Sequence, residues 1–157
     1  MKPTQALVCN IIDNLRRVFQ VVNEQSKKAE HETGLTGPQL WAIKVIAESA
    51  PIKVSDLARK MYLHPATVVG IIDRLELRGL VERTRSTKDR RVVEIALTIQ
   101  GNEIVRQSPE VAQGLLVRGL EALPDKKLTN ISDGLEQLVK IFGAQEIPPQ
   151  LLKRGVT

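Results

Sequence analysis

The sequence is poor in aromatic residues, cysteine and histidine. Aromatic residues make up 3% of the chain, so the stacking platforms that hold single-stranded nucleic acid are not expected. The one cysteine, Cys9, excludes an intrachain disulfide and a cysteine-rich metal site. With two histidines and no paired-carboxylate, metal-spaced or glycine-rich phosphate motif, the sequence argues against an enzyme and predicts no cofactor and no metal.

Long hydrophobic runs are also missing. No stretch approaches the roughly 18 consecutive apolar residues of a membrane-spanning helix, and the N-terminus lacks the charged-then-apolar layout of a secretion signal. We therefore expect a soluble, cytoplasmic protein without a membrane partner. Its 157 residues, 42% of them hydrophobic and 26% charged, are ordinary for one globular domain.

Positive charge is present in excess. The formal net charge is +5 and the sequence pI is about 9.6. Residues 51–100 hold ten Lys or Arg against six Asp or Glu, which places +4 of the total in under a third of the chain. A basic segment of this kind favours a polyanionic partner such as nucleic acid, although composition alone also fits a solvated basic surface.

The N-terminal third of the chain shows helical spacing of its apolar residues. Residues 4–33 contain no glycine or proline and predict one long amphipathic helix that Gly34 ends. Its apolar stripe consists of Leu7, Val8, Ile11, Ile12, Leu15, Val18, Phe19 and Val22. A second helix is predicted to start at Thr36, with Gln39 at the capping-box position, and to end at Ala50.

Residues 55–79 predict a short helix, a tight turn and a longer helix. Ser55 is expected to cap the short helix, Pro65 to open the longer one and Gly79 to follow its end. The flanking segments LVE and VVEIALT then predict a β-hairpin, whose tip is RTRSTKDRR at 83–91 with five basic residues and one acid. A helix–turn–helix followed by such a hairpin is a winged helix.

The remainder of the chain returns to helical spacing. Residues 99–123 predict a helix that Pro109 can bend, residues 128–142 predict a last helix, and residues 145–157 are expected to be irregular. The predicted fold class is therefore mostly α with a small β-hairpin wing, in which flanking helices accompany a winged helix-turn-helix.

A winged helix offers two elements to double-stranded DNA. The first turn of its second helix can read base edges in the major groove, and the hairpin can reach the minor groove or the backbone. The predicted DNA-binding residues are His64, Pro65, Ala66, Thr67, Val69, Gly70, Arg74, Arg83, Arg85, Lys88, Asp89, Arg90 and Arg91.

Several of these residues have a second interpretation. Thr67 can bond a base or phosphate, or a local backbone group, and Arg74 can reach phosphate or pair with a neighbouring acid. The charged hairpin tip can equally be a solvated loop. Asp89 is unexpected in a polyanion-binding loop. A carboxylate there can hold the guanidinium of one neighbour, Arg90 or Arg91, in a fixed pose while the other arginine reaches out.

Three stretches in this order resemble the MarR family of transcriptional regulators: LTGPQLWAI (35–43), VSDLARKMYLHPATVVGIIDRLELRGLVER (54–83) and DRRVVEIALTIQG (89–101). With the flanking helices the resemblance covers nearly the whole chain, as a single MarR-type domain at 1–157. One departure concerns Val69 and Gly70, where family members often have a hydroxyl and a basic residue.

The resemblance implies a homodimer. The DNA-binding lobe would lie at 36–98, and the helices at 4–33 and 99–143 would join the two copies. Such regulators are usually repressors that bind a pseudo-palindromic operator.

Many family members release DNA when a small aromatic or phenolic anion binds between the dimer helices and the DNA lobe. The resemblance suggests Arg16, His31 and Trp41 for this role, although a lone tryptophan is more often part of a core and a lone histidine a surface residue.

Two alternatives stay open. Some hydroperoxide-sensing members of the family have a reactive cysteine near the position of Cys9, but Tyr62 is the only tyrosine here, and a small buried residue in the dimer interface is the simpler interpretation. Winged helices also serve as protein–protein adaptors. An adaptor is expected to have a neutral or acidic recognition face, whereas residues 51–100 are basic.

Overall fold

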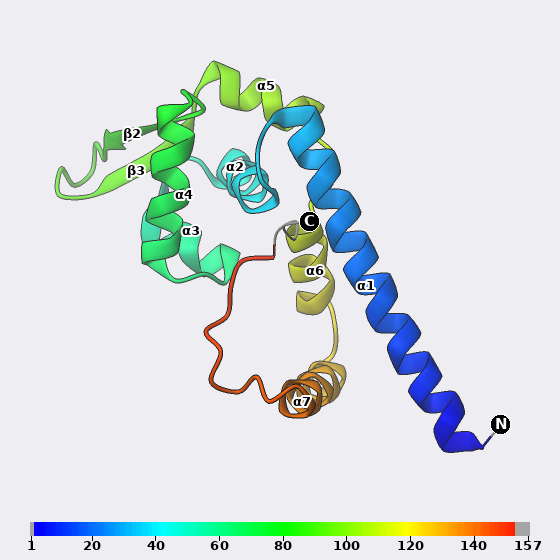
Figure 1. Cartoon of the computed structure of the whole chain (residues 1–157). Coiled ribbons are helices and arrows are strands. Elements are labelled where there is room, and N and C mark those ends of the chain that lie inside the picture. The colour runs from blue at the N-terminus through cyan, green and yellow to red at the C-terminus, as the bar shows by residue number, and fades with distance from the viewer. Residues whose placement is uncertain (1, 153–157) are drawn as a thin grey trace.

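A computed structural model describes residues 2–152 of the chain, which form seven helices and three strands (Figure 1). The elements are α1 (Pro3–Thr33), α2 (Gly37–Ser49), β1 (Ile52–Lys53), α3 (Val54–Met61), α4 (Pro65–Leu77), β2 (Val81–Arg85), β3 (Val93–Leu97), α5 (Ile99–Gln107), α6 (Ala112–Glu121) and α7 (Asp125–Ile141). The predicted fold class, mostly helical with a hairpin wing, is confirmed. Of the segment expected to be irregular, residues 153–157 lie outside the described residues.

Local sequence signals set the ends of α1 and α2. Gly34 takes the left-handed conformation with φ 71°, and its N–H donates to the carbonyl of Glu30. The Thr36 hydroxyl accepts from the backbone N–H of Gln39 at 3.3 Å, while the Gln39 side chain accepts from the N–H of Thr36 at 3.1 Å. The predicted C-cap and capping box are therefore confirmed.

The helices α3 and α4 form the predicted helix–turn–helix. Pro65 is the first residue of α4, and Gly79 follows its end with φ 71°. The cap predicted at Ser55 is wrong, because α3 begins earlier, with Lys53 as an N-cap that makes no side-chain hydrogen bond. The cause is β1, a strand that the sequence pattern did not predict. Lys53 pairs with Glu94 of β3, which holds the backbone extended up to the start of the helix.

The wing is part of a three-stranded antiparallel sheet in the order β1-β3-β2. Strand β2 pairs with β3 along its whole length, from Val81 to Arg85. The hairpin is confirmed, but the tip predicted at 83–91 is too long, since the irregular part begins at Ser86. Because an edge strand exposes alternate side chains to water, a polar sequence does not mark the end of its pairing.

A single hydrophobic core joins α2, α3, α4 and the sheet into a unit that we call the winged lobe (α2 to β3). Its fully buried apolar side chains include Leu40, Ile43, Ile46, Leu57, Val68, Ile72, Leu75 and Ile95. The guanidinium of Arg78 donates to the carbonyl of Gly34 at 2.7 Å and so ties the end of α4 to the end of α1. This core fixes α4 and the wing relative to each other.

Residues 99–123 form two helices rather than the one predicted. The helix α5 ends at Ser108, whose backbone is extended with ψ 149°. The cause is Pro109, since a proline ring disfavours the helical conformation of the residue before it. Gly114 and Gly119 lie within α6 and do not end it.

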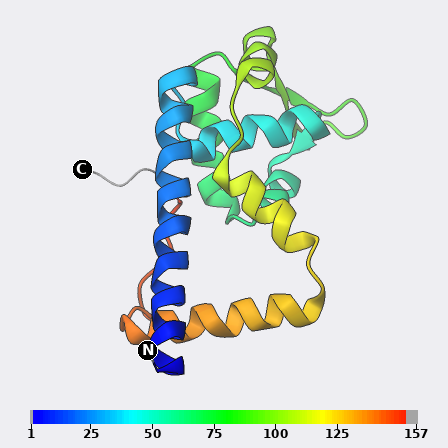
Figure 2. The same cartoon turned by 90° about the vertical axis from the view of Figure 1, so that its right-hand side faces the viewer.

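The helices α1 and α7 lie largely outside the core. The N-terminal half of α1 projects from the winged lobe in Figure 1, and Figure 2 shows α7 at the end of the molecule opposite α5. Only Ser26 and Ala29 of α1 are buried, and no residue of α7 is. Within residues 2–152, no helix has the length and apolar character needed to cross a bilayer.

Candidate nucleic-acid interface

The helix α4 has one buried face and one exposed face. The buried face consists of Val68, Ile71, Ile72 and Leu75. The exposed side, counting the N-cap His64, includes seven of the residues predicted to meet DNA, which are His64, Pro65, Ala66, Thr67, Val69, Gly70 and Arg74. The core therefore holds α4 from one side and leaves the other free, as a helix that enters a groove requires.

The first turn of α4 offers hydrogen-bond donors. The Nδ1 atom of His64 accepts from the backbone N–H of Ala66 at 3.2 Å, so the proton of the neutral ring is on Nε2, where it can donate to a base or phosphate. Within residues 2–152, the Thr67 hydroxyl and the Arg74 guanidinium have no hydrogen bond or ion pair. The local partners considered for both from the sequence are thus absent from the described chain, and both groups are available to a ligand.

A buried serine organises the tip of the wing. Ser86 is 6% exposed. Its backbone N–H donates to the carbonyl of Val92 at 2.8 Å, and its hydroxyl accepts from the N–H of Lys88 at 3.2 Å. The tip is therefore a defined turn. Sequence reasoning missed Ser86, because a serine within a polar run gives no signal of burial.

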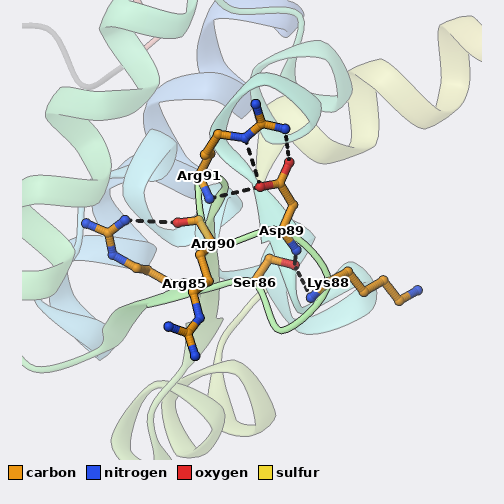
Figure 3. Close-up of polar contacts among 6 residues, drawn as sticks. All are labelled: Arg85, Ser86, Lys88, Asp89, Arg90 and Arg91. Atoms are coloured by element: carbon orange, nitrogen blue, oxygen red, sulfur yellow. Dashed lines mark hydrogen bonds and ion pairs between the residues drawn. The ribbon is translucent and has the colours of Figure 1, made fainter.

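Asp89 holds the side chain of Arg91 (Figure 3). Its Oδ1 accepts from the backbone N–H of Arg91 at 3.0 Å and from Nε at 3.1 Å, and its Oδ2 accepts from Nη2 at 3.2 Å. The predicted pairing of Asp89 with one arginine is confirmed.

The same contacts keep Asp89 ionised. Hydrogen bonds from the side chain and the backbone of Arg91, helped by the charge of Lys53, lower the pKa of Asp89 below its ordinary value of 3.8. Because the pKa is lowered, the ion pair is present at neutral pH and is lost only as the pH falls through that lowered value.

The remaining wing cations are exposed. The guanidinium of Arg85 donates to the carbonyl of Arg90 at 2.9 Å and joins the two sides of the tip. The charged ends of Lys88 and Arg90 have no partner among residues 2–152. The tip thus presents the guanidinium of Arg90 beside that of Arg91, which Asp89 orients.

Arg83 differs from the other wing arginines. It lies within β2, and its guanidinium pairs with Asp73 and, at 2.7 Å, with Glu76, both on α4. The side chain is 27% exposed, and the hydrogen bond to Asp73 is the main cause that raises its pKa above the ordinary value. The structure therefore places Arg83 as a brace between the wing and α4, away from the tip where it was predicted.

Known proteins share this pattern and fold. The model of the MarR family matches residues 35–93. The chain is 28% identical to the HTH-type transcriptional repressor MdtR of Bacillus subtilis (strain 168). The match extends over 155 residues, which are 99% of each chain. The crystal structure of a transcriptional regulator of the MarR family from Rhodococcus sp. RHA1 is 30% identical, with a TM-score of 0.56 over 85% of this chain and 96% of that one. This chain belongs to the MarR family.

The MarR-family fold recurs at lower sequence identity. The structure of Streptococcus pneumoniae FabT in complex with DNA is 20% identical, with a TM-score of 0.54 over 89% of this chain and 97% of that one. Since the MarR family consists of transcriptional regulators rather than enzymes, the chain is a DNA-binding transcriptional regulator.

The residues suggested for a MarR-type ligand site do not come together in one chain. Arg16 is exposed on α1 and pairs with Asp13, and His31 lines a shallow depression near α5. At a rise of about 1.5 Å per residue, these two are roughly 22 Å apart along α1. Trp41 is 7% exposed within the core and also lines a groove beside α6. The core interpretation of Trp41 and the surface interpretation of His31 are both correct.

A hydrogen bond between the winged lobe and α6 was not predicted from the sequence. Tyr62 ends α3 with a positive φ of 54°. Its hydroxyl donates to Oε1 of Glu121 at 2.7 Å, which raises the pKa of Tyr62. The two residues are 59 positions apart, so only the folded chain reveals the pair.

Proposed function

We propose that this MarR-family protein is a dimeric, sequence-specific regulator of transcription that represses genes near its operator. The observation that carries the proposal is the pairing of two exposed elements on one rigid lobe. The first turn of α4 presents base-reading groups, and the wing tip presents Arg90 beside the oriented Arg91. The similarity to the repressor MdtR supports repression rather than activation.

The wing tip suits a narrow, negative groove. An arginine held by a carboxylate has its donors fixed before binding, so less side-chain entropy is lost on contact with DNA. The guanidinium of Arg90, which has no partner within residues 2–152, and the ammonium of Lys88 add attraction to phosphates that does not depend on sequence. In this proposal, α4 supplies discrimination between bases and the wing supplies much of the affinity.

Dimerisation is supported by apolar surface that the single chain leaves uncovered. On α1, the large exposed apolar side chains are Leu7, Val8, Ile11, Ile12, Val18, Phe19 and Val21. On α6 and α7, they are Leu115, Leu116, Ile131, Leu135, Val139 and Ile141. Large apolar side chains exposed together on a few helices are typical of an interaction site. We assign the helices within 4–33 and 99–143 to the interface between two copies, and 36–98 to the DNA-binding lobe.

A two-fold dimer sets the form of the operator. Two symmetry-related α4 helices would enter successive major grooves on one side of the duplex, so the half-sites would be inverted repeats about one helical turn apart. Cys9 is exposed in the single chain and lies among the apolar residues of α1. We propose that the partner copy covers it.

A small aromatic or phenolic ligand is the proposed signal for release. The groove that Trp41 lines lies between the winged lobe and α6 and reaches His64 and Thr67 at the start of α4. A ligand there would contact both the reading helix and a helix of the proposed dimer interface, so it could shift one against the other.

Binding to the DNA upstream of the protein's own gene tests the proposal. We expect a gel-shift complex that survives excess unrelated DNA, with an affinity that falls steeply as salt rises. Arg90→Ala and Arg91→Ala should weaken the complex for every sequence tested. Binding without sequence preference would contradict a specific regulator, no binding to any duplex would favour a protein–protein adaptor, and wild-type affinity in both variants would exclude the wing as a DNA contact.

A further inference from the structure

The exposed side of α4 carries little side-chain bulk over its first two turns. At about 100° per residue, Ala66 lies directly opposite the fully buried Leu75 on the helix. Gly70, four positions after Ala66, lies above it on the same side, and both residues are exposed. The middle of the exposed side therefore presents only a methyl group and a hydrogen atom between the start of α4 and Asp73.

Packing within the described chain does not account for Gly70. Its backbone has an ordinary helical conformation, so glycine is not required there by a positive φ. A Cβ built on Gly70 would have no atom within 4 Å, whereas one built on Gly101 would collide with the carbonyl oxygen of Leu80. A glycine inside a helix is less favourable than alanine. Close approach of the α4 backbone to an outside partner would explain the residue.

The side chains around Ala66 and Gly70 are short. Residues 65–70 read PATVVG and include no arginine, lysine, asparagine or glutamine. The bidentate contacts that those side chains make to guanine or adenine are therefore not available there. The side chains of Ala66, Thr67 and Val69 instead present methyl groups on the exposed side of the helix. In the major groove, the apolar counterpart of such a group is the C5-methyl of thymine.

We propose that α4 recognises thymine in the operator through the C5-methyl group of the base. In this arrangement Ala66, Thr67 and Val69 supply the apolar contacts. Gly70 allows the helix backbone to come near enough for such short side chains to reach the bases. Removal of the methyl groups from water stabilises the complex without a hydrogen bond. The inference rests on the proposed function, because it names the base that the DNA-binding face of this regulator selects.

Uracil tests for the methyl group alone. Operators are first selected with the full-length protein from a library of random duplexes, and we expect thymine within each half-site. Deoxyuridine in place of thymidine removes the C5-methyl and keeps the hydrogen-bonding groups of the base. At the scale of one buried methyl group, the affinity should fall about fourfold for each half-site substituted. Equal affinity at every thymine tested would overturn the inference, and a preference for A·T pairs without this loss would favour recognition of groove shape.

Variants that shorten one side chain assign the methyl contact to α4. Ala66→Gly, Thr67→Ser and Val69→Ala each remove methyl groups from an exposed side chain. In at least one of them a uracil substitution should no longer reduce the affinity, and such a loss of additivity marks a direct contact. Leu77→Ala is the control and should keep every uracil effect, because Leu77 is 87% exposed on the same side of α4 but about two turns beyond Gly70. Uracil effects that stay intact in all three variants would overturn the assignment to α4.

Gly70→Ala tests the close approach of the helix. The added methyl group meets no protein atom within 4 Å and favours the helix, so the midpoint of thermal unfolding should rise at a fixed protein concentration. Operator affinity should nevertheless fall about tenfold, as when a methyl group is forced into a closely packed contact. Unchanged operator affinity would overturn the role of Gly70. If the library yields no preferred sequence at all, the proposed function fails as well, whereas preferred sequences without methyl dependence contradict this inference alone.

Discussion

The winged lobe differs from the helices α1 and α7 in how far its apolar residues are buried. In the lobe, Leu40, Ile43 and Leu75 are fully buried by neighbours from the same chain. On α7 no residue is buried, and on α1 Leu7, Val8, Ile11 and Ile12 are exposed. The lobe is thus complete within one chain, whereas the two helices have apolar surface that the single chain leaves uncovered and that the proposed dimer would bury.

The same contrast applies to charge at the proposed DNA-binding face. Arg83 has its partners on α4, whereas the guanidinium of Arg90 has none among residues 2–152. Groups satisfied within the chain should affect stability when they are changed. Groups left unsatisfied should affect binding to an outside partner.

The largest expected effect is on the proposed association of two copies. Leu135→Asp places a carboxylate on the apolar face of α7, where Leu135 is 54% exposed in the single chain. By two-fold symmetry the change enters the interface twice, and at roughly 2–3 kcal/mol for each poorly paired polar group the dimer should weaken by about 1000-fold or more. Light scattering after size-exclusion chromatography should show a monomer.

Leu77→Asp is the matched control. Leu77 is 87% exposed on α4, within the lobe that is complete in one chain. We expect this variant to remain a dimer. If Leu135→Asp remained a dimer and Leu77→Asp became a monomer, the proposed interface would lie on the winged lobe and not on α7.

The next largest effect is on the stability of the lobe. Leu75 and Leu77 are close neighbours on α4, but the first is fully buried and the second 87% exposed. Leu75→Ala should lower the free energy of unfolding by about 2–5 kcal/mol, and Leu77→Ala should change it by less than about 0.5 kcal/mol. Urea titrations at one fixed protein concentration measure both, since the proposed dimer would make stability depend on concentration. Similar losses in the two variants would mean that the lobe core is not closed as described.

A smaller effect is expected at Asp89, whose carboxylate orients Arg91. Asp89→Ala makes the wing more positive but frees the guanidinium, so we expect DNA affinity to fall about threefold to tenfold. Fluorescence anisotropy with an operator duplex provides the measurement. Glu103→Ala is the control, because Glu103 also pairs with an exposed arginine, Arg106, but on α5. Tighter binding by Asp89→Ala would show that the wing acts only as bulk charge.

The sequence predicts the elements of the lobe well where a local signal exists. The capping box at Thr36, the start of α4 at Pro65 and the left-handed Gly79 all follow from side chains within a few residues. Prediction from the sequence fails where an element depends on a contact between segments that are far apart in the chain. The strand β1 exists because Lys53 pairs with Glu94, and no pattern in two residues can reveal that pairing.

The proposed DNA-binding face shows the same limit of prediction from sequence. The exposed residues of α4 follow from helical periodicity, and the pairing of Asp89 with an arginine follows from their proximity in sequence. By contrast, Arg83 could not be separated from the other wing arginines, since its partners Asp73 and Glu76 lie on another element. The sequence gives the number of cations near the wing. Only the fold shows which of them pair within the chain and which remain as candidate contacts to DNA.

The smallest expected effect tests that division directly, with two variants that each remove one positive charge. Arg83→Ala breaks partly exposed ion pairs to Asp73 and Glu76 and should lower the free energy of unfolding by about 0.5–1 kcal/mol. Because Arg83 is not assigned to a phosphate, the slope of log affinity against log salt should not change. Arg90→Ala should leave stability unchanged and reduce the magnitude of that slope by about one, as expected for the loss of one phosphate contact. If Arg83→Ala reduces the slope and Arg90→Ala does not, the two roles have been assigned to the wrong arginines. Arg83 would then be the residue that contacts DNA, and Arg90 would not.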